Sequence, residues 1–253
     1  MYLTERFFFE HKNFFSLITK NNNKKNNYNY LDYTFFYIEN EILLSFFIIF
    51  LSDKILCKFF GKKARYYQLH SFINLLITYR IFPDIKNFFI NPINAYRLID
   101  NNLDSYLIIS LHFYHILIAN SLNFIEIIHH LLFVAFGVFP VIFYINSNQI
   151  YLGYIACSGL PGVFEYGLLS LLKNNKISLY TQKYYTVYLY NYFRYPLALY
   201  GCYLNLTLWK YNNILKNDSL YMSIYINILL FINGSVFNQI TLKSYYNKNF
   251  NFN

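Results

Sequence analysis

A long stretch almost free of charge constrains the fold of this chain more than any other feature. Between Asp104 and Lys173 the only residues that are charged by type are Glu126 and Glu165. A membrane-spanning helix needs about 20 predominantly apolar residues, so this stretch is long enough for several such helices. Only helices and closed barrels satisfy backbone polar groups in lipid, and these apolar windows are too long for barrel strands. The sequence therefore predicts an all-α membrane protein.

The composition agrees with a protein that lies in a membrane. Hydrophobic residues make up 56% of the chain and charged residues 13%, whereas a soluble domain has about 25% charged residues. The net charge of +9 is spread over both sides of the predicted helices, as is typical of loop residues near lipid phosphates, so we expect no nucleic acid partner. Cys57, Cys157 and Cys202 have no metal-ligand spacing and are expected to act as small apolar residues.

Seven apolar windows can cross a bilayer, with six as the minimum count, and they predict a polytopic transmembrane helical bundle. They lie near 34–53, 66–84, 104–122, 125–146, 149–172, 185–209 and 219–241. The expected parts are a polar and aromatic N-terminal arm (1–33), a first span (34–58), a main transmembrane domain (60–242) and a short polar tail (243–253). Charged residues flank the apolar cluster at 7–9 on both sides and leave no long apolar segment, so we expect no removable targeting segment. Lys and Arg divide equally between the two sides, which leaves the orientation open, and the oligomeric state is open as well.

A histidine pair opens the fourth window. A helix that turns about 100° per residue places Glu126, His129 and His130 within one arc, so all three can face one cavity. One imidazole could act as a general base while the other holds a substrate oxygen, with Glu126 setting the tautomer. The alternative is an ordinary interfacial position at the helix end. An ionisable group in a span is by default a functional-site hypothesis.

The third window adds His112 and His115, which are three residues apart and therefore on one face of a helix. Together with Glu126 and His129 they form an HxxH and ExxH pattern that could bind a metal. Membrane di-iron enzymes need more histidine boxes than the six histidines of this chain can supply. Hydrogen bonding between helices is the commoner role of polar side chains in spans. We therefore expect neither a metal nor a bound cofactor.

An acid and a base on different windows form a second candidate pair. Pro161, between two glycines, interrupts the fifth window one turn before Glu165, and the backbone groups it frees need a neighbour or a cavity. Arg194 stands alone among apolar and aromatic residues of the sixth window and needs an anion, for which Glu165 is the obvious candidate. Two roles stay open for the pair: locking two helices together, and binding a lipid or substrate.

In their order these motifs resemble the TLC-domain family, membrane proteins that include ceramide synthases and the translocating-chain-associating protein. The corresponding strings within residues 60–242 are SYLIIS (105–110), EIIHHLL (126–132), FEYGLL (164–169) and NYFRYPLA (191–198). The resemblance implies a helical bundle around a lipid-accessible cavity. It also implies a location in the endoplasmic reticulum or a related internal membrane, with membrane lipid as the partner.

Two classes of function follow from this resemblance. The first is a non-catalytic protein of lipid homeostasis that binds, senses or moves a lipid. The second is an acyltransferase resembling ceramide synthases, with acyl-CoA as substrate; elongase-like or metal-dependent lipid enzymes are a further alternative. The third window has Ser110 at the family's acidic position, and the double aspartate that follows the histidine pair in ceramide synthases is missing, which favours the first class. The expected lipid-binding or substrate-binding residues are Glu126, Glu165, Arg194, His112 and His115, with His129 and His130 catalytic if the protein is an enzyme.

Overall fold

The computed structural model describes the backbone of residues 30–118 and 124–250, and side chains of residues 40–118, 124 and 127–247. The chain separates into two units, Met1–Asn40 and Glu41–Asn253. The site and its surroundings lie in the second unit, and the description below concerns that unit. Its described part contains helices and no strand, so the predicted all-α class is confirmed there.

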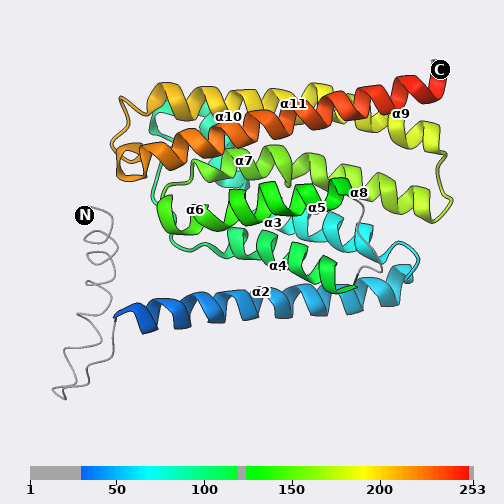
Figure 1. The fold of residues 1–253 in the computed structure, drawn as a ribbon, viewed down its shortest axis with the longest axis horizontal. Helices are drawn as coiled ribbons and strands as arrows, with labels where there is room; N and C mark the ends of the chain where they lie inside the picture. Colours follow the sequence, from blue (N-terminus) through cyan, green and yellow to red (C-terminus); the bar gives the residue numbers. More distant parts are fainter. Residues whose placement is uncertain (1–29, 119–123, 251–253) are drawn as a thin grey trace. The chain divides into compact units, whose positions relative to one another are not determined.

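Ten α-helices are described (Figure 1). They are α2 (Tyr30–Phe60), α3 (Arg65–Ile90), α4 (Leu103–Ile118), α5 (Phe124–His129), α6 (Phe139–Tyr144), α7 (Ile150–Cys157), α8 (Leu160–Lys173), α9 (Leu179–Leu189), α10 (Tyr195–Leu208) and α11 (Leu220–Phe250). Two π-helical segments, η2 (His130–Val138) and η3 (Tyr190–Arg194), join α5 to α6 and α9 to α10 without a break. Short 3₁₀ turns cover Pro92–Asn94 and Leu215–Asn217.

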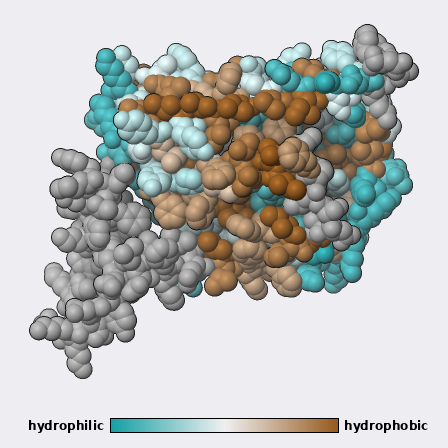
Figure 2. All heavy atoms as spheres, in the orientation of Figure 1, coloured by the Kyte–Doolittle hydropathy of each residue, from teal (hydrophilic) through white to brown (hydrophobic). Residues whose placement is uncertain are grey.

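Three helical segments in the described part are apolar and long enough to cross a membrane: Ile127–Tyr144, Ile150–Lys173 and Leu220–Asn247. The helix Leu103–Ile118 is apolar but shorter. Large apolar side chains on several helices are nevertheless exposed, as the brown surface over the middle of the helices in Figure 2 shows. Such exposed apolar surface is expected of a protein surrounded by lipid. The predicted count of seven spans stays a prediction.

Both π-helical segments end just before a proline. Proline has no N–H and its ring collides with the carbonyl four residues earlier, which disturbs a regular turn. In each case the residue before the proline donates its N–H to the carbonyl five residues back: Phe139 to Val134, and Tyr195 to Tyr190. Pro140 and Pro196 thus explain the two widened turns. π-helical turns occur often at functional sites. The segment η2 begins at His130 and η3 ends at Arg194, so both segments contain a candidate site residue.

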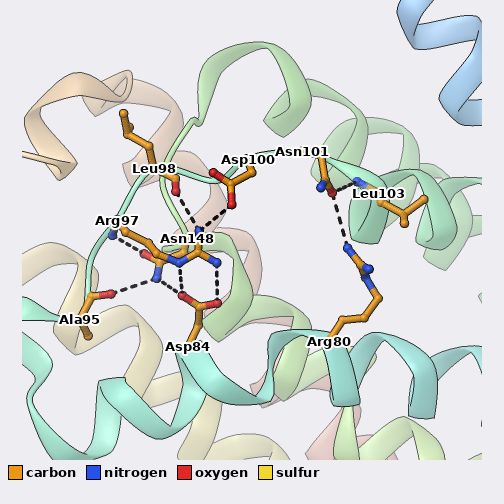
Figure 3. A network of polar contacts seen from close by, with 9 residues as sticks. All are labelled: Arg80, Asp84, Ala95, Arg97, Leu98, Asp100, Asn101, Leu103 and Asn148. Atoms are coloured by element: carbon orange, nitrogen blue, oxygen red, sulfur yellow. Dashed lines mark hydrogen bonds and ion pairs between the residues drawn. The ribbon is translucent and has the colours of Figure 1, made fainter.

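Ion pairs and amide contacts hold the connections at one end of the unit, drawn in Figure 3. Arg97 donates from Nε and Nη2 to the two carboxylate oxygens of Asp84, at 2.8 and 2.9 Å. Asn148 donates to Asp84 at 2.7 Å and to the Ala95 carbonyl at 3.0 Å. These contacts tie α3 to the connection before α4 and to the connection between α6 and α7. We call this side of the unit the paired end.

Asp218 forms a second buried contact at the paired end. Its carboxylate accepts hydrogen bonds from the Asn146 N–H at 2.6 Å, from the Ser147 hydroxyl, and from Gln149 Nε2 at 2.7 Å. Burial raises the pKa of Asp218, although these hydrogen bonds act in the opposite direction. The start of α11 is therefore fixed to the connection between α6 and α7.

Candidate functional site

A cavity of about 320 Å³ lies within the unit, between α3, α4, η2, α7, α8, η3 and α11. Much of its wall is apolar, with side chains such as Phe133, Val134, Leu229 and Phe237. Nine of the polar side chains that reach the same cavity come from seven helical segments: α3, α4, α5, η2, α8, η3 and α11. They are His70, Asn74, His112, His129, His130, Glu165, Tyr190, Arg194 and Asn233.

Five histidines gather at one side of this cavity, from α3, α4, α5 and η2. The ring centroids of His112 and His130 are 5.0 Å apart, and those of His115 and His130 are 5.1 Å apart. His70 brings its ring to 5.4 Å from His112 and 5.6 Å from His115. His129 lies 5.8 Å from His112. The histidines of the two predicted motifs therefore lie close together, and His70 extends the group beyond the prediction.

Several ring nitrogens of this group are buried without a hydrogen-bond partner. These atoms are His70 Nε2, His115 Nδ1 and His129 Nδ1. By contrast, His112 Nδ1 lies 2.7 Å from the Ile108 carbonyl, one turn earlier in α4. A buried polar atom without a partner costs about 1–3 kcal/mol, so a polar ligand group that reached these nitrogens would stabilise the site. Among the side chains that the structure describes, no three histidine, cysteine or acidic groups are arranged to hold a metal.

Arg194 also lines the cavity and is buried, with 4% of its surface exposed. Its Nη1 donates to the Tyr190 hydroxyl at 2.5 Å and, more weakly, to Glu165 Oε2 at 3.5 Å. The Tyr190 hydroxyl in turn donates to Glu165 at 2.5 Å. Nη2 donates to Asn233 Oδ1 at 2.7 Å. The predicted contact between Glu165 and Arg194 is present, but Tyr190 mediates most of it.

The guanidinium of Arg194 is also held between two aromatic rings. Its central carbon lies 4.5 Å from the Tyr190 ring centre and 5.2 Å from that of Phe237. Such cation–π contacts are strongest where water is excluded. Arg194 Nε is buried and has no hydrogen-bond partner. One donor of a firmly held guanidinium is therefore left without an acceptor.

The other predicted site residues take different positions. Glu126 belongs to α5, but its side chain lies outside the described residues, so its role as a partner of His129 stays a prediction. His115 belongs to the histidine group and stacks on Tyr66, with ring centroids 3.8 Å apart, without lining the cavity itself. Pro161 begins α8 one turn before Glu165, as the break in the fifth window indicated.

The sequence did not single out three residues of the site: His70, Tyr190 and Asn233. His70 and Asn74 are four residues apart in the weakest window, and both are buried. This spacing of two polar residues on one helical face was the available signal for α3. Tyr190 is one of 29 tyrosines, so its type carries no signal. Asn233 is equally inconspicuous in a chain rich in asparagine.

A close approach of α3 and α8 shapes this part of the cavity. A Cβ atom added at Gly162 would lie 2.5 Å from Asn74 Nδ2, far inside van der Waals contact. Glycine at this position of α8 therefore leaves the space that the Asn74 amide occupies beside the cavity. The interruption of the fifth window at Pro161 and its neighbouring glycines, noted in the sequence, therefore allows this close packing of α3 and α8.

Comparisons of the chain with protein-family models, with curated proteins and with solved structures found no match. The TLC-domain resemblance therefore stays a prediction that rests on its four motifs. The fold and the site themselves define a helical protein with membrane-length apolar helices and a cavity that combines apolar walls with buried polar groups.

Proposed function

We propose that this is a multi-pass membrane protein of lipid homeostasis that holds a lipid in its cavity. One observation carries the proposal: apolar walls and buried polar atoms without partners, on Arg194 and the histidine group, belong to the same cavity. A ligand that uses both must carry an apolar chain and a polar head, which is the chemistry of a membrane lipid. The four TLC-type motifs support the same assignment.

The size of the cavity limits how the lipid is held. A volume of about 320 Å³ is at the lower end of the range of small-molecule sites, about 300–1,000 Å³. The cavity can therefore enclose a headgroup and part of a chain, and the remainder would extend between helices into the bilayer. Arg194 Nε and the histidine nitrogens are suited to the head, and side chains such as Phe133 and Leu229 are suited to the chain.

Acyl transfer is the second candidate, and the orientation of His112 favours it. If Nδ1 donates to the Ile108 carbonyl at 2.7 Å, the neutral ring has its acceptor at Nε2. That nitrogen could take the proton of a lipid hydroxyl or amine while the oxygen or nitrogen attacks an acyl-CoA thioester and the thiolate leaves. In this case His112, one of the predicted substrate-binding residues, would be the base instead of a residue of the adjacent histidine pair.

Mass spectrometry of detergent-purified protein tests both candidates. Lipid binding predicts that an intact, exchangeable lipid copurifies with the wild type and is depleted in Arg194→Gln and in His129→Ala/His130→Ala. Lys210→Gln changes an exposed residue at the paired end that does not line the cavity; it is the control and should retain the lipid. A covalent acyl group on a histidine would favour the enzyme. Equal lipid content in all four proteins would contradict both candidates.

A further inference from the structure

The two ends of the unit differ in charge. The end opposite the paired end comprises the last turns of α2, α8 and α11 and the first turns of α3 and α9 (Figure 1). Contacts between them place these segments together: the Tyr66 and Tyr166 hydroxyls are 3.5 Å apart, and Lys183 donates to the Ser244 carbonyl at 3.0 Å. We call it the basic end. Six of its exposed lysines are Lys58, Lys62, Lys63, Lys173, Lys176 and Lys243.

The positive charge of the basic end is not compensated by acids in the described residues. Among the described side chains, two acidic ones lie in that half of the unit, and both are engaged inside it; the side chain of Glu126 in α5 is not among those described. Asp53 is buried and accepts from Arg65 Nε at 2.7 Å, and Glu165 accepts from Tyr190 in the cavity. None of the six lysines has an ion-pair partner among the described side chains.

The paired end is balanced instead. Arg80 donates to Asp104 at 2.8 Å, and Arg97 is paired with Asp84 and, at 3.6 Å, with Asp100. Among the described side chains, the basic ones there are Arg80, Lys86, Arg97, Lys210 and Lys216, and the acidic ones are Glu41, Asp84, Asp100, Asp104 and Asp218. Their charges cancel. The equal division of Lys and Arg in the sequence includes five basic residues of the arm, all before residue 26, which lie outside the described residues.

Exposed tyrosines lie at the basic end, as Tyr211 and Tyr221 do at the paired end. Tyr180 and Tyr185 in α9 are exposed, at 54% and 53%, and Tyr180 lies 6.1 Å from Tyr245 of α11 between ring centres. Tyrosines gather at membrane–water interfaces, where the ring lies among apolar groups and the hydroxyl reaches water. A belt of tyrosines beside exposed lysines is therefore the arrangement expected at the headgroup level of a bilayer.

We propose that the basic end lies against a leaflet rich in anionic phospholipids, so that its lysines contact the lipid headgroups. Lysines close to an anionic membrane surface are attracted to it within about one Debye length. Because His70 and Tyr66 lie in the first turns of α3, the histidine side of the cavity is on the side of that leaflet.

The inference rests on the location in a membrane and not on the lipid in the cavity. The test is the association of spin-labelled phosphatidylserine and phosphatidylcholine with the full-length protein in mixed vesicles of both lipids. The wild type should prefer phosphatidylserine, and added salt should reduce the preference because it screens exposed charges. In the triple variant Lys58→Gln/Lys62→Gln/Lys63→Gln, the association constant of phosphatidylserine relative to phosphatidylcholine should fall at least about five-fold. A decrease of this size is the effect expected of a single lysine near an anionic surface.

The matched control removes the same number of charges at the paired end, as Lys86→Gln/Lys210→Gln/Lys216→Gln, and should keep the preference. Thermal melting and the lipid that copurifies should be the same for both variants, which separates this inference from the proposed cavity function. A wild type without preference for phosphatidylserine, or equal losses in the two triple variants, would overturn the inference even if a lipid occupies the cavity.

Discussion

Tyr190 should contribute more to the stability of the cavity than the direct contact between Glu165 and Arg194. Its hydroxyl donates to Glu165 and accepts from Arg194, both at 2.5 Å, whereas the two charged groups are 3.5 Å apart. The informative perturbation is Tyr190→Phe, which keeps the ring against the guanidinium and removes only the hydroxyl. Tyr192→Phe in the same π-helical segment is the matched control, because Tyr192 is 68% exposed.

The expected loss follows from these contacts. A hydrogen bond to a charged group contributes about 1.5–3 kcal/mol, and Tyr190 makes two. The side chain of Glu165 is 21% exposed, so it can recover part of its loss in water, and we expect Tyr190→Phe to lower the free energy of unfolding by about 3 kcal/mol. For a chain of this size that corresponds to a melting temperature lower by roughly 6–12 °C. Tyr192→Phe should change it by no more than about 0.5 kcal/mol.

The assay is thermal unfolding of purified protein in detergent, followed by a double-mutant cycle of Glu165→Gln and Arg194→Gln. Removing one partner of a buried pair costs about 3–5 kcal/mol, because the other charge stays buried, so the double variant should be less destabilised than the sum of the single ones. Repeating the cycle in Tyr190→Phe should reduce the coupling. Strict additivity of the two substitutions, or equal melting temperatures of Tyr190→Phe and Tyr192→Phe, would refute the reasoning.

Three further predictions concern the packing around the cavity. Gly162→Ala should cost about 1–3 kcal/mol of stability, because the added Cβ would lie 2.5 Å from Asn74 Nδ2. The control is Gly167→Ala in the same helix, whose added Cβ would lie 3.7 Å from its nearest atom. This control should be neutral or stabilising in thermal melts. Burial raises the pKa of Asp218, so its carboxyl group holds a proton more tightly in the folded state than in the unfolded chain. The stability of the wild type relative to Asp218→Asn should therefore decrease as the pH rises through that raised pKa. Thermal melting at a series of pH values measures this difference. Pro196→Ala restores an N–H that can close a regular turn, so it should lower lipid retention through a rotated η3 while circular dichroism keeps its helical signal; unchanged lipid retention would contradict this.

Several features of the site could be read from the chain because they depend on one helix at a time. The helical period places His112 and His115 on one face, and it places His129 and His130 in one arc, without any knowledge of neighbouring helices. The pairing of Glu165 with Arg194 was also predictable, since a buried ion without a counter-charge is costly in a span. The predicted count of seven spans stays a prediction. Among the described residues, three segments meet the length and hydropathy of a membrane span, and the described part of α4 is shorter.

Other features depend on how separate helices rotate and cross, which is set by side-chain packing over long distances in sequence. The sequence by itself determined the helical class, the apolar surface and the polar residues that had to face inward. Tertiary structure alone brought His70 to the other histidines, inserted Tyr190 between Glu165 and Arg194, and paired the arginines of one end while leaving the lysines of the other exposed. The physical reason is that the helical period fixes directions within a helix, whereas distances between helices are decided by close packing such as that of Gly162 against Asn74.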